Sequence, residues 1–166
     1  MRSDRVVKLG VGVLAVVALV FGAGRGWAQG AAPASGSGSA LSIAQDGLMQ
    51  PEALVALLQA KAEKPLVLQV GSHVLFEEAH IAGSEYAGPG SQAAGLQVLR
   101  ERVAGVAKDR AIVLYCGCCP WGRCPNMGPA FHLLQELGFT RVKALYLANN
   151  LGTDWVDKGY PVERGH

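Results

Sequence analysis

Short, mostly apolar runs recur in the middle and at the end of the chain, and each has the length of a buried strand. The runs at 66–70 (LVLQV) and 111–115 (AIVLY) place hydrophobic residues at consecutive rather than alternate positions. This pattern is typical of strands that are buried on both faces. A third strand is expected at 141–147.

Hydrophobic residues between and around these runs recur at spacings of three and four, which predicts helices that face a core. Helices are expected at 51–62, 92–107 and 129–137, with a last helix at 150–158. Gly138 stands in the C-cap position of the third helix. In the second helix the apolar positions are Leu96, Leu99, Val103 and Val106.

Strands that alternate with helices predict an α/β domain, a parallel sheet covered by helices on both faces. Ligands of such sheets bind beyond the carboxyl ends of the strands. The cysteines lie within nine positions, directly after the run at 111–115 and before the next helix: Cys116, Cys118, Cys119 and Cys124. The sequence therefore predicts a functional site in this loop.

The length and charge of the chain exclude several classes of protein. A chain of 166 residues suits one globular domain plus an apolar segment, and is too short for a large multidomain enzyme. The net charge is +2, but the first 28 residues carry +3 and the remainder −1. Because the remainder is not basic, nucleic acid is not expected as a partner.

The N-terminal segment has the three parts of a secretory signal. A basic start precedes an apolar run at 9–24 and small residues at Gly26 and Ala28, so cleavage is expected before Gln29. The run of 16 residues is shorter than the roughly 20 of a membrane-spanning helix, so only an uncleaved signal would contact a membrane. We expect a periplasmic or secreted protein with a signal peptide at 1–28, a flexible linker at 29–45 and one domain at 46–166.

The cysteine cluster indicates chemistry rather than a disulfide scaffold. Exported cysteines usually form disulfides, but bridges within nine residues close only short loops and constrain the unfolded chain little. A thiolate at a strand end that faces a helix N-terminus has a lowered pKa, which predicts that Cys116 is reactive. Gly117 and Gly122 allow backbone N–H groups to converge on an anion, and Arg123 adds a positive charge. Such a loop suits a thiolate, a persulfide or a small sulfur oxyanion.

Several short motifs follow one another along the expected domain. Residues 80–84 (HIAGS) precede 112–116 (IVLYC), which ends in the first cysteine, and 137–139 (LGF) closes the third helix. Trp155 and then 159–163 (GYPVE) stand near the C-terminus. In this order the motifs make the chain resemble the rhodanese-like family across almost the whole domain. The resemblance implies a rhodanese-like parallel sheet covered by helices on both faces, and sulfur transfer through a cysteine persulfide.

The chain departs from the family pattern next to the expected site. Gln69 and Gly71 stand where the family has Asp and Arg, so a familiar polar support is missing. Arg123 follows Cys118 with the family's four intervening residues but follows Cys116 with six, so the spacing leaves the nucleophile open. We prefer Cys116, because the strand end fixes its position.

The resemblance implies a role for each residue of the loop. Cys116 is the catalytic thiol, which takes sulfur from thiosulfate or a persulfide and passes it to a thiol or cyanide. His80 and Trp121 are interpreted as structural residues. No cofactor and no metal ligand belong to this hypothesis. The substrate-binding residues are Gly117, Cys118, Cys119, Gly122 and Arg123, and the possible resolving thiols are Cys118, Cys119 and Cys124.

Two other hypotheses stay open at this point. Cys116 and Cys119 have the Cys-x-x-Cys spacing of a thiol–disulfide oxidoreductase. Alternatively, the loop of a non-catalytic module binds a partner protein or a soft metal such as Cu(I). Zinc is the least expected metal, because its four ligands usually arrive as separated pairs.

Overall fold

The computed structural model describes residues 42–165. The expected signal peptide at 1–28 and most of the expected linker at 29–45 lie outside the described residues. Ile43, within that linker range, is already buried in the core. Among the helices of the described part, none is both long enough and apolar enough to cross a membrane.

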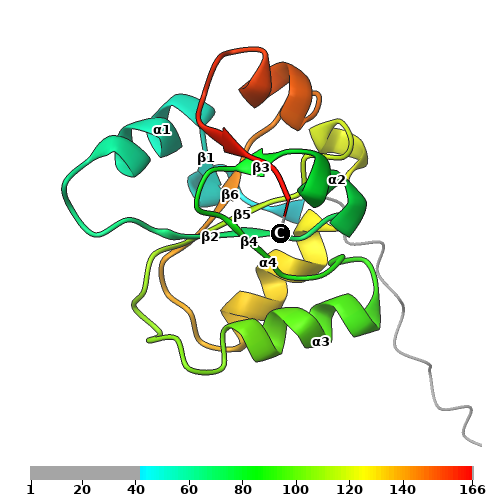
Figure 1. Ribbon diagram of the computed structural model, residues 1–166. Coiled ribbons are helices and arrows are strands. Elements are labelled where there is room, and N and C mark those ends of the chain that lie inside the picture. The colour runs from blue at the N-terminus through cyan, green and yellow to red at the C-terminus, as the bar shows by residue number, and fades with distance from the viewer. Residues whose placement is uncertain (1–41, 166) are drawn as a thin grey trace, which may run out of the picture. The chain divides into compact units, whose positions relative to one another are not determined.

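A five-stranded parallel sheet forms the centre of this unit (Figure 1). The predicted α/β architecture is confirmed, because each strand pairs in parallel with its neighbours. The three strands in the middle of the sheet are those that the runs at 66–70, 111–115 and 141–147 predicted. The order across the sheet is β1 (Leu48–Met49), β6 (Val142–Leu145), β5 (Ile112–Tyr115), β2 (Leu66–Gln69) and β4 (Glu85–Tyr86).

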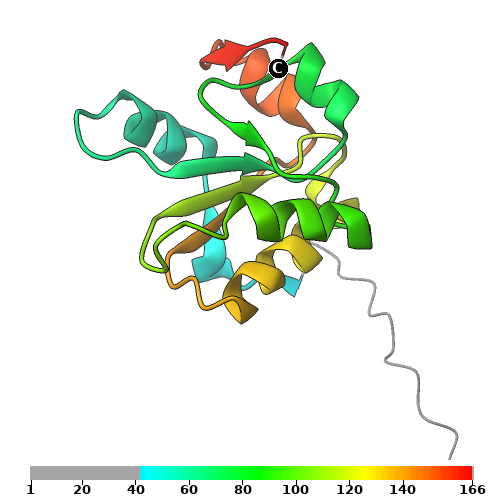
Figure 2. The ribbon, with the colours of Figure 1, turned by 60° about the horizontal axis from the view of Figure 1, so that its bottom comes forward.

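Helices cover both faces of the sheet, as Figure 2 shows. Helices α3 (Ala93–Arg102) and α4 (Met127–Glu136) lie together on one face. Helix α1 (Pro51–Gln59) and the π-helical turn η4 (Gly152–Val156) lie on the other. The two faces therefore have separate hydrophobic cores, and the sheet is the layer between them.

Strand β5 supplies both cores with alternate residues, since successive side chains of a strand point to opposite faces. Ile112, Leu114 and Cys116 belong to the core under α3 and α4. Val113 and Tyr115 belong to the core under α1 and η4. All four residues of β5 are buried, which confirms the prediction from its continuous apolar run.

Three predicted helices are shorter in the structure than expected, and the first of them, expected at 51–62, ends at Gln59. The helix expected at 92–107 ends at Arg102, and Val103 and Val106 still contact the core from a turn in which the Val106 N–H bonds to the Val103 carbonyl. The helix expected at 150–158 is the turn η4, where the Asp157 N–H bonds to the Gly152 carbonyl at 2.8 Å.

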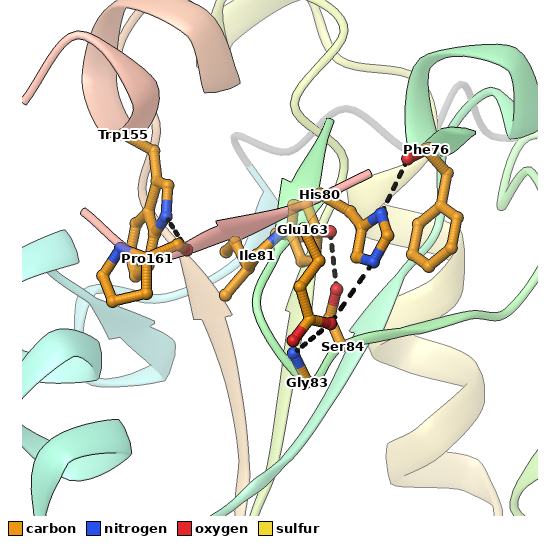
Figure 3. Close-up of polar contacts among 9 residues, drawn as sticks. Phe76, His80, Ile81, Gly83, Ser84, Trp155, Pro161 and Glu163 are labelled. Atoms are coloured by element: carbon orange, nitrogen blue, oxygen red, sulfur yellow. Dashed lines mark hydrogen bonds and ion pairs between the residues drawn. The ribbon is translucent and has the colours of Figure 1, made fainter. Parts of the chain in front are cut away.

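A second, two-stranded sheet joins two segments that are distant in sequence. Strand β3 (His80–Ile81) pairs antiparallel with β7 (Val162–Glu163). The motif at 80–84 and the motif at 159–163 therefore contact each other. Trp155 donates its indole N–H to the Pro161 carbonyl at 2.9 Å, which links η4 to the same sheet (Figure 3).

His80 has the structural role that the sequence predicted. Its Nδ1 donates to the carbonyl of Phe76 at 2.8 Å, and its ring stacks on the Phe76 ring at 3.9 Å between centroids. Its Nε2 lies 3.7 Å from the Glu163 carboxylate (Figure 3). These contacts hold helix α2 (His73–Glu78) against the β3–β7 sheet.

Candidate functional site

Cys116 follows β5 directly and begins a loop that passes through the 3-10 turn η3 (Trp121–Arg123) to α4. Its side chain is only 4% exposed, whereas Cys118 is exposed. The Cys116 and Cys118 sulfurs are 3.0 Å apart, and the Cys118 and Cys119 sulfurs 3.3 Å. All four cysteines are free thiols in the structure. The loop therefore gathers its sulfur atoms into one cluster at the carboxyl end of the central strand.

Asn126 is a residue of this site that the sequence analysis missed. It stands at the N-terminus of α4, is 7% exposed and makes no capping hydrogen bond to the helix. Its Oδ1 accepts the backbone N–H of Ser91 at 2.9 Å, so the amide can be oriented in only one way. Its Nδ2 consequently donates to the Cys116 sulfur at 3.2 Å and lies 4.0 Å from the Cys118 sulfur.

Gln69 supplies a polar support that the sequence comparison had suggested was missing. Its Nε2 donates to the Cys116 carbonyl at 3.3 Å and its Oε1 accepts the Gly71 N–H at 3.2 Å. A side chain at Gly71 would place its Cβ 3.0 Å from the Cys116 sulfur and 2.9 Å from the Cys116 carbonyl oxygen. The two departures from the family pattern therefore fit each other: Gln69 holds the backbone of Cys116, and Gly71 leaves room for it.

Gly117 sets the direction of the chain after Cys116. Its φ is +78°, a left-handed conformation that glycine adopts without steric cost. A Cβ at this position would lie 2.9 Å from the Leu151 Cβ, and the Gly117 carbonyl accepts the Leu151 N–H at 3.0 Å. The loop is thereby fixed to the start of η4.

Cys118 is the thiol of the cluster whose pKa is lowered. The hydrogen bond that Cys116 donates across 3.0 Å holds the pKa of the Cys118 thiol well below its usual range. Hydrogen bonding to Cys118 and Cys124, together with burial, raises the pKa of Cys116, and burial raises that of Cys119 to about 12. The sequence predicted a lowered pKa for Cys116; in the structure the lowering falls on its neighbour, because Cys116 is the buried donor of the pair.

An open cavity of about 270 Å³ gives access to these two sulfurs. It lies beyond the carboxyl ends of β2 and β5, where the α/β architecture predicted a site. Glu78 is the only Asp, Glu, Lys or Arg among its described lining residues. Besides Glu78, the lining consists of Gln69, Leu75, Ala79, Cys116, Gly117, Cys118, Asn150, Leu151, Gly152 and Val156.

The residues that sequence reasoning assigned to substrate binding divide into two groups. Gly117 and Cys118 line the cavity. The described lining does not include Cys119, Gly122 or Arg123. Gly122 and Arg123 are exposed in η3.

A second, smaller cavity of about 10 Å³ adjoins Cys116. The sulfurs of Cys116, Cys119 and Cys124 line it and lie within 4.8 Å of one another, which makes them the candidate metal ligands of the described chain. Trp121 also lines it, and its ring contacts Tyr146 at 5.4 Å between centroids. Trp121 therefore has a packing role, as its sequence context predicted.

Comparisons with known proteins identify the fold. No family model and no curated protein matches the chain. The rhodanese-like domain of the Alr3790 protein from Anabaena sp. is 21% identical, with 71% of this chain and 79% of that chain covered and a TM-score of 0.53. The BH2092 protein from Bacillus halodurans is 22% identical over 70% and 76% of the two chains, with a TM-score of 0.56. A cysteine persulfide form of an EanB variant with ergothioneine is 20% identical over 70% of this chain and 28% of that chain, with a TM-score of 0.53.

Proposed function

Since the chain has the rhodanese-like fold, we propose that it is a sulfurtransferase or persulfide carrier that moves sulfane sulfur through a persulfide at Cys116. The observation that carries the proposal is the pair of sulfurs 3.0 Å apart at the end of the central strand, one buried and one exposed. Both sulfurs line the open cavity. The EanB structure, which contains a cysteine persulfide on a similar fold, supports the same chemistry.

The first step is a proton transfer within the sulfur pair. The Cys116 and Cys118 sulfurs are 3.0 Å apart, hold one proton between them and titrate as a pair. When that proton lies on Cys118, the charge moves to Cys116, which is then the nucleophile. Asn126 Nδ2, at 3.2 Å, donates a hydrogen bond to the new thiolate. This donor is fixed before the reaction, so it needs no reorganisation.

The second step transfers the sulfur atom. The Cys116 thiolate attacks the outer sulfur of a persulfide, a bond to that sulfur forms, and the donor leaves as a thiolate. With thiosulfate as donor, the same attack releases sulfite. A thiol or cyanide acceptor then attacks the outer sulfur of the Cys116 persulfide and regenerates the Cys116 thiolate, so that no other oxidant or reductant is needed.

The charge of the cavity favours a persulfide over thiosulfate as the sulfur donor. The described lining contains one carboxylate, Glu78, and no Lys or Arg. Thiosulfate carries two negative charges that would face this carboxylate and the cluster thiolate. A persulfide on a small organic thiol or on a protein side chain brings less charge to the cavity.

The oxidoreductase hypothesis paired Cys116 with Cys119, but in the structure the cysteine in contact with Cys116 is Cys118. The Cys119 sulfur lies within 4.8 Å of the Cys116 sulfur, but the Cys118 sulfur lies at 3.0 Å. On this arrangement Cys118 is the first resolving thiol of a Cys116 persulfide. Its attack on the Cys116 sulfur would release hydrosulfide and leave a Cys116–Cys118 disulfide.

We also propose export to the periplasm or the cell exterior, with cleavage before Gln29. The support is the basic start, the apolar run at 9–24 and the small residues at Gly26 and Ala28. N-terminal sequencing of protein recovered from fractionated cells tests this proposal. A mature chain that begins at Gln29 in an exported fraction supports it, and an intact N-terminus in the cytoplasm refutes it.

Mass spectrometry of the reduced protein tests the sulfurtransferase proposal. The protein is exposed to glutathione persulfide and, separately, to thiosulfate, and each cysteine is scored for added sulfur by peptide fragmentation. We expect one added sulfur atom on Cys116, removable by cyanide, and none in Cys116→Ser. Cys124→Ser, which leaves the outer cavity intact, is the matched control and should load normally. Loading of Cys118 in Cys116→Ser at the wild-type rate would refute the assignment.

A further inference from the structure

We propose that the smaller cavity beside Cys116 is a binding site for one Cu(I) ion, with the sulfurs of Cys116, Cys119 and Cys124 as ligands. The three sulfurs come from both ends of the loop and lie within 4.8 Å of one another. They line a cavity of about 10 Å³, room for a single small species. The inference goes beyond sulfur transfer, because two of its three ligands have no part in the proposed reaction.

The chemistry of the cavity favours a soft cation. Its ligating atoms are the three cysteine sulfurs and the thioether of Met127, and its described lining contains no carboxylate or imidazole. The remaining lining is apolar: Gly117, Trp121, Leu145 and Leu147. Cysteine and methionine sulfurs select Cu(I), whereas Mg²⁺, Ca²⁺ and Mn²⁺ require oxygen ligands. Structural zinc takes four ligands that usually arrive as two separated pairs, a pattern that this loop lacks.

Fixed N–H donors offset the negative charge that three thiolates would place there. The Cys124 sulfur accepts hydrogen bonds from the backbone N–H groups of Asn126 and Met127, at the first turn of α4. Asn126 also donates its side-chain N–H to the Cys116 sulfur at 3.2 Å. Such hydrogen bonds orient the ligands of metal sites and stabilise their charge.

Cys116 connects this site to the outside. It lines both the smaller cavity and the larger one, and the exposed Cys118, which lines the larger cavity, contacts it. An ion can therefore pass from Cys118 to Cys116 by exchange of one thiolate ligand for the next. Because one sulfur serves both purposes, a bound Cu(I) ion and a persulfide on Cys116 exclude each other.

The test is an anaerobic titration of the full reduced chain with Cu(I), supplied as its acetonitrile complex, in competition with bicinchoninate. We expect one Cu(I) per chain, with only sulfur neighbours in X-ray absorption spectra. Cys119→Ser and Cys124→Ser should each weaken binding at least about 100-fold, the upper end of what loss of a ligand's hydrogen-bonding partner costs. Cys118→Ser is the matched control and should change the affinity less than about tenfold.

The outcomes separate this site from the sulfurtransferase proposal. Cys119→Ser and Cys124→Ser keep Cys116, so both should still load sulfur while they fail to hold Cu(I), which also shows that they fold. Cys119 is only partly buried, so it provides a variant with little risk to folding if Cys124→Ser is unstable. Wild-type protein that loads sulfur but binds no Cu(I) overturns the metal site alone. Equal loss of Cu(I) in Cys118→Ser overturns the choice of ligands.

Discussion

Replacement of Asn126 by Asp tests how the protein stabilises the Cys116 thiolate. The change keeps the size of the side chain, and one carboxylate oxygen can still accept the Ser91 N–H that Oδ1 accepts at 2.9 Å. The other oxygen replaces the N–H donor that now lies 3.2 Å from the Cys116 sulfur. Asn126→Asp therefore removes one hydrogen bond to the thiolate and adds a negative charge beside it.

The structure allows the size of the effect to be worked out. A hydrogen bond to a charged group contributes about 1.5–3 kcal/mol. At about 1.4 kcal/mol per factor of ten, its loss alone slows sulfur loading of Cys116 by about 10- to 100-fold. The repulsion of the carboxylate adds to this, so the range is a lower limit. The cluster already carries one thiolate at neutral pH, so the variant changes how easily that charge moves to Cys116 and not the pH at which the thiolate forms. Loading therefore slows by a similar factor across the neutral range.

The assay is the rate of persulfide loading on Cys116, followed by mass spectrometry against pH. Acid should partly restore the variant, because a protonated carboxyl regains an O–H that can donate to the sulfur. Gln135→Glu makes the same change of charge near the far end of α4 and should load as the wild type does.

Two results would refute the reasoning. Loading at the wild-type rate in Asn126→Asp would mean that the amide does not stabilise the thiolate. A slow rate that acid fails to restore would mean that the residue acts only by holding the loop in place.

Four further predictions follow from the same geometry. In Cys118→Ser, loading of Cys116 should slow at neutral pH and recover as pH rises, because burial still raises the pKa of Cys116 and no neighbouring thiol shares its proton; a pH profile equal to the wild type's contradicts this. Glu78→Gln should speed loading by thiosulfate by up to a few fold, at low salt only, and leave loading by glutathione persulfide nearly unchanged. Gly117→Ala should lower the free energy of unfolding by about 1–3 kcal/mol in urea denaturation, since its φ is +78° and its Cβ would meet η4; an unchanged midpoint refutes the close contact. Burial raises the pKa of Tyr115 to about 12, so its contribution to stability is complete below pH 10 and is lost as pH rises towards 12, and Tyr115→Phe should remove that part of the alkaline loss.

The sequence was sufficient for the three middle strands of the sheet, whereas the short edge strands β1 and β4 were not predicted. The apolar run at 111–115 predicted β5 because a central parallel strand needs hydrophobic residues on both faces, and the structure buries all of them. Gly138 was predicted to end α4, and its φ of +85° is the conformation that such a position requires. These features are local, so the pattern of neighbouring residues determines them.

The features that the sequence did not reveal depend on contacts between distant residues. Asn126 is a site residue because the Ser91 N–H, 35 positions earlier, fixes its amide, and nothing in the surrounding residues signals that contact. The lowered pKa belongs to Cys118 rather than Cys116 because of a 3.0 Å contact that only the folded loop creates. Pairing of β3 with β7 spans about half of the chain, which is too far for any local pattern to indicate. The sequence held one indirect signal for Asn126: an amide side chain at the start of a predominantly apolar helix, two residues after a cysteine.

The last described residue affects how this protein can be labelled. The Gly165 N–H donates to the Glu77 carbonyl at 2.8 Å, and Glu77 belongs to α2, whose neighbouring residues Leu75 and Glu78 line the open cavity. An affinity tag or fluorophore fused after this point starts next to α2, the helix that supplies two residues of the cavity lining. A reporter that must not disturb the reaction therefore belongs elsewhere. The same closeness makes this end a suitable anchor for a tethered persulfide, held at high effective concentration over the cavity.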